Sequence, residues 1–150
     1  MPTDYFPTLK ELNLFIEYNL GEDTALEIIL YNKFPNGVFC KTCKRVRRHH
    51  KERKRRSYCC DYCGTHMHPT AGTIFARSTT PLTLWFYAIY LIQSSGGKIP
   101  ASELQRQLGV TYKCAWRMKD KICWHVALQK TYSYKYSSKV NGRQYQLGLV

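Results

Sequence analysis

Four cysteines stand in two pairs whose spacing suits a metal ion. Cys40 and Cys43 form one Cys-x2-Cys pair, Cys60 and Cys63 form a second, and 16 residues lie between the pairs. A tetrahedral zinc ion accepts four thiolates, and each Cys-x2-Cys turn presents two of them from one tight knuckle. Two knuckles complete the coordination without water, so the spacing predicts one structural Zn²⁺ rather than a catalytic one.

Other ligand sets are also compatible with the sequence. Cys59 competes with its neighbour Cys60, but Cys60 gives the two-residue gap. Gly64 follows the second pair, where a glycine can adopt the positive φ that closes a knuckle. His66 and His68 could replace a thiol, and a bare set of buried thiols without metal is a further alternative.

The chain contains seven cysteines, an odd number that favours thiols and metal ligands over a disulfide framework. Cys114 and Cys123 fall on a predicted helix, where small core residues are the simplest interpretation. The N-terminus lacks a secretory signal, so we expect an intracellular protein, in the cytoplasm or nucleoid, or in the nucleus of a eukaryotic or viral host. The longest apolar run is too short to span a bilayer, and we expect no membrane partner.

A strongly basic insert separates the two cysteine pairs. Nine of the thirteen residues from Lys44 to Arg56 are Lys or Arg, and Glu52 is the only acid. We expect an exposed finger that binds the phosphates of DNA with little sequence choice, since counterion release supplies affinity. A solvated charged loop and a nuclear localisation signal are the alternatives. The candidate DNA contacts are Arg45, Arg47, Arg48, Lys51, Arg53, Lys54, Arg55 and Arg56.

The charge of the whole chain supports a polyanionic partner. Its formal net charge is +13, which a folded core does not require. Residues 1–37 are net −4, whereas residues 38–68 are net +8 and residues 69–125 are net +5. This composition predicts nucleic acid as the class of partner, contacted by the basic part of the chain after residue 37.

Helical patterns flank the cysteine region. Thr8 and Glu11 form a capping box for a helix from Leu9 to about Asn19, and Asp23 or Thr24 can cap a second helix that ends before Pro35. Thr80 and Pro81 suit the N-cap and first position of a buried helix over 82–94. A helix over 101–108, a turn at Gly109 and Val110, and a third helix capped by Thr111 then predict a helix-turn-helix.

The third helix is the expected recognition helix. Its first turn and the side opposite Ala115 would face the major groove, which selects Thr111, Tyr112, Lys113 and Arg117 as DNA contacts. Trp116 could belong to either the core or the groove. A plain helical bundle is the alternative to a helix-turn-helix.

The fold class predicted is therefore mainly α with a small β zinc ribbon. We expect a helical hairpin over 1–37, the ribbon with its basic finger over 38–75, the helix-turn-helix over 76–125 and a basic tail over 126–150. In the tail, Asn141 and Gly142 separate two tyrosine-containing runs, Lys135–Val140 and Arg143–Gly148, which favours a β-hairpin.

Several motifs together resemble a known family. They are Phe34-Pro-Asn-Gly-Val-Phe-Cys40, Tyr58-Cys-Cys-Asp-Tyr-Cys-Gly64, Thr73-Ile-Phe75, Pro81-Leu-Thr-Leu-Trp-Phe-Tyr-Ala-Ile-Tyr90 and the segment Leu104–Met118. Their order resembles the N-terminal module of zinc-ribbon insertion-sequence transposases of the DDE type, a group related to the eukaryotic Merlin elements. The resemblance covers roughly residues 8 to 125.

That resemblance implies recognition of transposon ends, and hence a role in transposition and DNA recombination. In the family, an RNase-H-like domain follows, and its acidic residues hold two metal ions for strand cleavage. The last carboxylate side chain here is Asp120, so we expect no catalysis from this chain alone. The leading hypothesis is a zinc-stabilised module for double-stranded DNA, acting as a homodimer or beside a separate catalytic chain. The alternative is an RNA-binding or protein-interaction zinc ribbon of transcription-type machinery.

Overall fold

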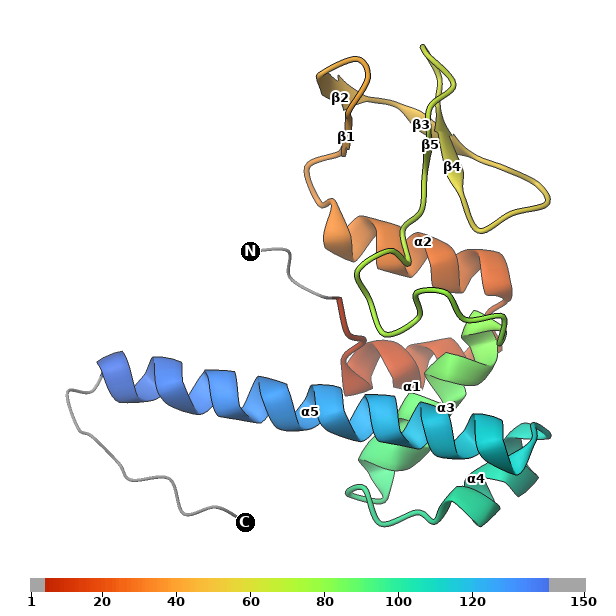
Figure 1. The fold of residues 1–150 in the computed structure, drawn as a ribbon, viewed down its shortest axis with the longest axis vertical. Helices are drawn as coiled ribbons and strands as arrows, with labels where there is room; N and C mark the ends of the chain where they lie inside the picture. Colours follow the sequence, from red (N-terminus) through yellow and green to blue (C-terminus); the bar gives the residue numbers. More distant parts are fainter. Residues whose placement is uncertain (1–4, 141–150) are drawn as a thin grey trace.

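The computed structural model describes the backbone of residues 5–140 and the side chains of residues 5–127. Five helices and two small antiparallel sheets make up this part of the chain, and the sheets lie at one end with the helices below them (Figure 1). The elements in order are α1 (Leu9–Glu17), α2 (Glu22–Lys33), β1 (Val38–Cys40), β2 (Arg45–Arg47), β3 (His49–Lys51), β4 (Tyr58–Cys60), β5 (His66–Met67), α3 (Leu82–Ser94), α4 (Ala101–Leu108) and α5 (Tyr112–Val140).

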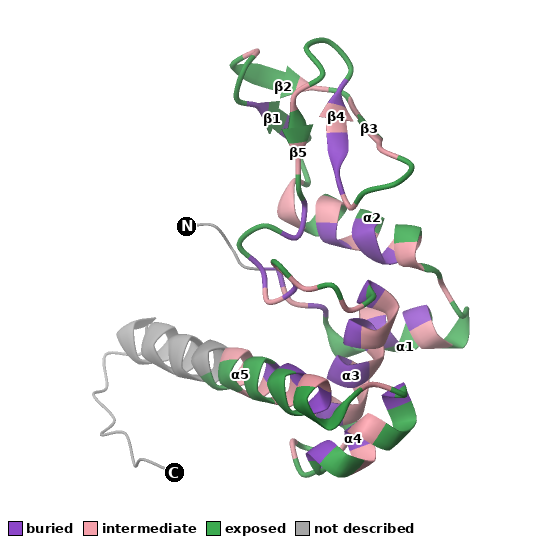
Figure 2. Ribbon diagram, turned by 45° about the vertical axis from the view of Figure 1, so that its right-hand side comes forward, coloured by how far each residue is buried: buried purple, intermediate pink, exposed green. Residues whose placement is uncertain are grey.

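Helix α3 is the centre of the molecule. It packs against α1, α2, α4 and α5, and none of its residues from Leu82 to Gln93 is exposed, as its nearly continuous apolar sequence predicts (Figure 2). Phe86 lies edge-on to Phe15 of α1, and Trp85 lies edge-on to Phe75 of the preceding loop. Because one helix supports all the others, the helical part forms a single hydrophobic core.

The N-terminal ends of the first helices differ in their capping. The capping box of Thr8 and Glu11 is present as predicted. Helix α2 begins at Glu22 with Gly21 as N-cap, so the prediction of a cap at Asp23 or Thr24 is wrong. The carbonyl of Gly21 accepts the first helical hydrogen bond, from the N–H of Ala25 at 3.0 Å.

The prediction of Thr80 as the N-cap of α3 is also wrong. The N-cap is Pro81, which has no side chain able to accept a hydrogen bond. Instead Glu22 reaches across from α2, and its carboxylate accepts hydrogen bonds from the backbone N–H groups of Leu82 at 2.8 Å and Thr83 at 3.1 Å. An acidic residue from a distant element thus satisfies the free donors of this helix end.

The cysteine region forms two small sheets whose strands follow one another along the chain. Strands β1 and β2 pair with Cys40 opposite Arg45. Strands β3, β4 and β5 form the second sheet, in which His50 lies opposite Cys59 and Cys59 lies opposite His66. Tyr58 of β4 belongs to the same buried cluster as the helices, so it joins the ribbon to the core.

The predicted tail hairpin is wrong in the part that the structure describes. Helix α5 runs to Val140, so the first expected strand, Lys135–Val140, is helical, and the second, Arg143–Gly148, lies outside the described residues. The sequence contains no proline or glycine from Val110 to Val140, and an isolated two-stranded ribbon is marginal in water. Helix α5 therefore continues where a hairpin was expected.

Helices α4 and α5 meet at a short turn. Gly109 ends α4 with a φ of 68°, a left-handed conformation that favours glycine, and α5 follows after Val110. None of the helices within the described residues is long and apolar enough to cross a membrane.

Candidate metal centre and nucleic-acid interface

The sulfur atoms of Cys40, Cys43, Cys60 and Cys63 come together from two turns. All four Sγ atoms lie within 4.8 Å of one another, and the Cys40 and Cys63 sulfurs are 3.4 Å apart. None of them forms a disulfide. Such a cluster can hold one metal ion as a closed four-thiolate site, and the two buried members, Cys40 and Cys60, come from the ends of β1 and β4.

The two turns share one backbone design. Lys44 N–H donates to the carbonyl of Cys40 at 2.8 Å, and Gly64 N–H donates to the carbonyl of Cys60 at 2.9 Å. The φ angles of Lys44 and Gly64 are 54° and 71°, both left-handed. Gly64 was predicted to close its turn in this way, whereas Lys44 adopts the same conformation despite its side chain. In the first turn the backbone N–H of Cys43 also points at the Cys40 sulfur, 3.4 Å away.

The protonation of the cluster also suits a cation. Hydrogen bonding from Thr65 lowers the pKa of Cys63 to about 6, whereas desolvation and the neighbouring thiols raise the pKa of Cys43 to about 12. Thiols packed this closely cannot all ionise without a positive charge among them. A divalent ion supplies that charge, so metal binding would displace protons from the cluster.

The alternative ligands lie elsewhere. Cys59 and His66 belong to a separate group with Glu52, and His68 lies in neither group among the described residues. Cys59 and Cys60 are neighbours in β4, where successive side chains point to opposite faces of the sheet. The choice of Cys60 over Cys59 for the four-cysteine cluster therefore agrees with the strand geometry.

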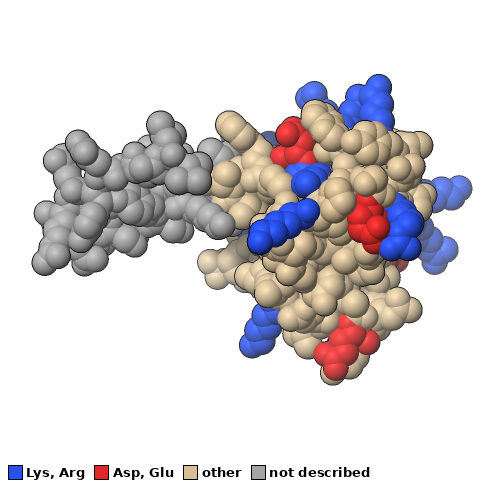
Figure 3. Space-filling view, turned by 90° about the horizontal axis from the view of Figure 1, so that it is seen from below, with Lys and Arg blue, Asp and Glu red and all other residues tan. Residues whose placement is uncertain are grey.

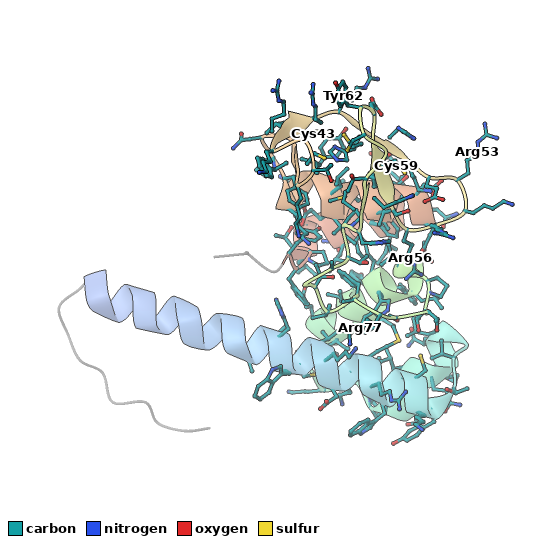
Figure 4. The ribbon with its side chains drawn as sticks, turned by 45° about the horizontal axis from the view of Figure 1, so that its top comes forward. Cys43, Arg53, Arg56, Cys59, Tyr62 and Arg77 are labelled. Atoms are coloured by element: carbon teal, nitrogen blue, oxygen red, sulfur yellow. The ribbon has the colours of Figure 1, made fainter. Side chains whose placement is uncertain are left out.

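The basic insert is not one finger but two strands and a loop. Strand β2 pairs with β1, and strand β3 pairs with β4, so half of the insert is held inside the two sheets. The loop over 52–57 projects from the second sheet, with Arg53 near its tip (Figure 4). The prediction of one exposed finger from Lys44 to Arg56 is therefore wrong, and only this loop projects.

Three partly buried cations of the insert make close contacts within the molecule. Arg56 donates to the backbone carbonyls of Ser78 at 3.0 Å and Thr80 at 2.7 Å, and it pairs with Glu22 at 3.0 Å. Lys51 pairs with Asp23 at 2.9 Å. The guanidinium of Arg47 lies 4.4 Å above the centre of the Tyr62 ring.

The other cations of the insert are exposed. Arg48 is nearly fully exposed and makes only a distant ion pair with Asp61, at 3.8 Å. Arg55 lies 4.0 Å from Glu52, which is a weak contact at an exposed site. The exposed candidates from the insert are Arg45, Arg48, Arg53, Lys54 and Arg55.

The predicted recognition residues lie on the surface at the start of α5. The Thr111 hydroxyl accepts a hydrogen bond from the backbone of Cys114 at 3.3 Å, as a capping residue does. Tyr112, Lys113 and Arg117 are exposed, and Trp116, which the sequence left between core and surface, is also exposed. Ala115 and Met118 on the opposite side are buried, so the predicted division of this helix into two faces is present.

Two further cations, Arg77 and Lys121, adjoin these residues and were not predicted. They line a cleft of about 320 Å³ together with Lys113 and Arg117, between the loop before α3 and the first turns of α5. Lys121 follows Arg117 by four residues, a helical spacing that could have predicted it. Arg77 could not have been found this way, because the fold alone brings its loop beside α5.

Arg56 connects the two basic areas. It lines a hollow with Arg53, Lys54 and Arg55, and the acidic Glu22 and Asp23 of α2 also line this hollow. Arg56 also binds the Ser78–Thr80 backbone that borders the cleft of Arg77. Figure 4 shows the labelled Arg53, Arg56 and Arg77 in succession from the ribbon towards α5. We call the exposed cations of the two areas the cationic track: Arg53, Lys54, Arg55, Arg77, Lys113, Arg117 and Lys121. Arg56 is half-buried and lies between the two areas without belonging to the track.

The track lies toward one side of the molecule. The loop between β3 and β4 and the first turn of α5 both project to the right in Figure 1. Seen from below, the surface is mixed, with acidic groups between scattered Lys and Arg, and several cations stand at that same right-hand edge (Figure 3).

Comparisons of the chain with protein-family models, with curated proteins and with solved structures found no match.

Proposed function

We propose that this chain is a zinc-stabilised module that binds double-stranded DNA. The observation that carries the proposal is the cationic track, in which exposed Arg and Lys residues belong to the β3–β4 loop, the loop before α3 and the start of α5. The β3–β4 loop and the start of α5 lie on the same side of the ribbon (Figure 1). A row of cations on several elements suits the regular phosphates of a duplex better than a compact acidic ligand.

The four-cysteine cluster has a structural role in this proposal. It takes Zn²⁺, whose preference for four thiolates in a tetrahedron matches the donor set. The ion ties the end of β1 to the end of β4, and β3, which leads into the basic loop, is paired to β4. Zinc therefore fixes the base of that loop while its charged tip stays exposed.

Helices α4 and α5 act as a helix-turn-helix, with α5 as the recognition helix. The exposed first turn carries Tyr112 and Lys113, and Arg117 follows one turn later on the exposed surface. Arg and Lys can pair with guanine edges in the major groove, whereas the loop cations meet phosphates only. The helix supplies sequence preference, and Arg53, Lys54 and Arg55 supply affinity.

The order of motifs also supports a more specific role. The module resembles the end-recognition part of zinc-ribbon transposases, so the duplex that it prefers would be a transposon end. In this proposal the chain binds the DNA end and does not itself cleave the strand. Incubating the chain with duplex ends and Mg²⁺ should leave the DNA intact. Cleavage products would contradict the proposal that the chain binds these ends without cleaving them.

The alternative, an RNA-binding ribbon, is tested by competition. The zinc-loaded chain is bound to a fluorescent duplex and then titrated with unlabelled duplex DNA or with RNA of the same length. We expect duplex DNA to displace the probe at a concentration at least about tenfold lower, because the recognition helix fits the B-form major groove and not the deep, narrow one of RNA. Equal displacement by the two competitors would contradict the proposal.

A further inference from the structure

The outer face of the second sheet carries a second group of metal-ligating side chains. Strands alternate their side chains, so Cys60 points towards the four-cysteine cluster and Cys59 points to the other face. On that face Cys59 of β4 lies opposite His66 of β5, and Glu52 follows the end of β3. Three strands thus bring a thiol, an imidazole and a carboxylate together.

The donor atoms of this group converge on one point. The Cys59 sulfur is 3.2 Å from Nδ1 of His66, and the same Nδ1 is 3.3 Å from a carboxylate oxygen of Glu52. All three donor atoms lie within 4.8 Å of one another. Ligands of a tetrahedral zinc ion stand roughly 3.3 to 3.5 Å apart, given Zn–S near 2.3 Å and Zn–N near 2.0 Å. The two distances from Nδ1 of His66 are already close to that spacing.

Hydrogen bonds alone do not explain why the donor atoms of Glu52, Cys59 and His66 lie so close together. In a neutral imidazole, Nδ1 either donates to the Glu52 carboxylate or accepts from the Cys59 thiol, and it cannot do both. The carboxylate oxygen near Nδ1 also accepts a hydrogen bond from the Ser57 hydroxyl at 2.7 Å, which fixes the carboxylate in place. A cation at the centre would be favourable to all three donors at once.

We propose that Glu52, Cys59 and His66 form a second site for a divalent transition metal of the zinc type. Sulfur, nitrogen and oxygen donors together suit Zn²⁺ or Co²⁺ and not the oxygen-preferring Mg²⁺ or Ca²⁺. On binding, the Cys59 thiol loses its proton to solvent, and the oxidation state of the metal does not change. His66 ligates through the lone pair of its neutral ring, and Glu52 ligates as a carboxylate.

This second site differs from the four-cysteine cluster in its coordination. Three protein ligands leave a fourth position, and the group is half-exposed at Glu52 and Cys59 and exposed at His66. Water or an external ligand can therefore reach the ion, as it can in open zinc sites. His50 is in register with Cys59 but is taken up by Asp61, whose oxygen is 2.6 Å from its ring, so it is not a ligand.

Metal stoichiometry tests the proposal independently of DNA binding. The full chain, stripped of metal under reducing conditions, is titrated with Co²⁺ while its visible absorption is recorded, and bound metal is measured after dialysis. We expect two ions per chain, the first with a four-thiolate spectrum and the second with a weaker thiolate band. Cys59→Ser should lower the stoichiometry from two to one and leave the four-thiolate spectrum intact.

Matched variants separate a second site from a general loss of structure. Cys114→Ser removes a thiol outside both groups and should retain two ions, whereas His66→Ala, at an exposed position, should retain one. His50→Ala, on the same face, should retain two. One ion per chain in the unchanged protein would overturn the proposal. Loss of the four-thiolate spectrum in both Cys59→Ser and His66→Ala would also overturn it, because these residues would then support the cysteine cluster alone.

Discussion

At the level of single residues, the cysteines differ in how far the sequence determines their place. The Cys-x2-Cys spacing, together with Gly64, was enough to select Cys60 for the cluster, since local turn geometry decides it. The left-handed conformation of Lys44 could not be predicted, because lysine has no preference for it. The pairing of Cys59 with His66 depends on strand register, which the spacing of the residues does not give.

Arg56 is a residue whose role changes once its surroundings are known. In the sequence it is one of nine equivalent cations, but in the fold it donates to carbonyls 22 and 24 residues further along and pairs with Glu22. Contacts at that separation follow from tertiary packing alone. We expect Arg56 to position the basic loop on the helical core, while its neighbours contact DNA.

The first prediction compares Arg56→Ala with Arg53→Ala. Arg56→Ala should lower the free energy of unfolding by about 2 kcal/mol, because two carbonyls and a partly buried carboxylate lose a charged donor. Arg53 is exposed, so Arg53→Ala should change the free energy of unfolding by less than about 0.5 kcal/mol. Urea denaturation measures both. Equal stability losses in the two variants would show that Arg56 does not anchor the loop.

At the level of elements, the helices were easier to predict than their connections. Prolines and glycines on either side of 82–94 and 101–108 gave both helices their observed bounds. The tail was misjudged because Asn141 and Gly142 suggested a turn, although the residues before them continue α5 without a helix breaker. The basic insert was misjudged because its charge pattern does not reveal that β2 pairs with β1 and that β3 pairs with β4.

The second prediction concerns the end of α3. Because Pro81 provides no cap, Glu22→Ala should leave the N–H groups of Leu82 and Thr83 without their acceptor. The loss should be about 1 to 2 kcal/mol in the free energy of unfolding, the usual cost of removing a helix cap. Glu27→Ala, an exposed acid on the same helix, is the control. Thermal denaturation measures both variants, and equal melting temperatures for Glu22→Ala and Glu27→Ala would contradict this role of Glu22.

At the level of the whole molecule, the hydrophobic core and the four-cysteine cluster hold different parts of the chain together. The helices share one hydrophobic core, to which β4 contributes Tyr58, while the ends of β1 and β4 are held together by the cysteines. A small sheet of short strands has little apolar area of its own, so we expect its folding to depend on a metal ion held by the four cysteines. We expect the helices to fold without that ion, because they share a hydrophobic core.

The third prediction is therefore a partial unfolding on metal removal. A strong zinc chelator should abolish the amide dispersion of residues 38–68 in NMR spectra while most of the helical circular dichroism remains. Cys60→Ser should give the same spectra before any chelator is added. Loss of the helical signal together with the ribbon would mean that the chain folds as one unit around the metal.

The central claim is that one duplex contacts both the basic loop and the recognition helix along the cationic track. The direct measurement is the salt dependence of duplex affinity for the unchanged chain, for Arg53→Ala/Lys54→Ala/Arg55→Ala and for Lys113→Ala/Arg117→Ala, each on a preferred and an unrelated duplex. The loop variant should reduce the slope of log K against log salt by about 2 to 3 on both duplexes. The helix variant should mainly remove the preference between the duplexes. Identical effects of the two variants, or an unchanged affinity in both, would contradict the account.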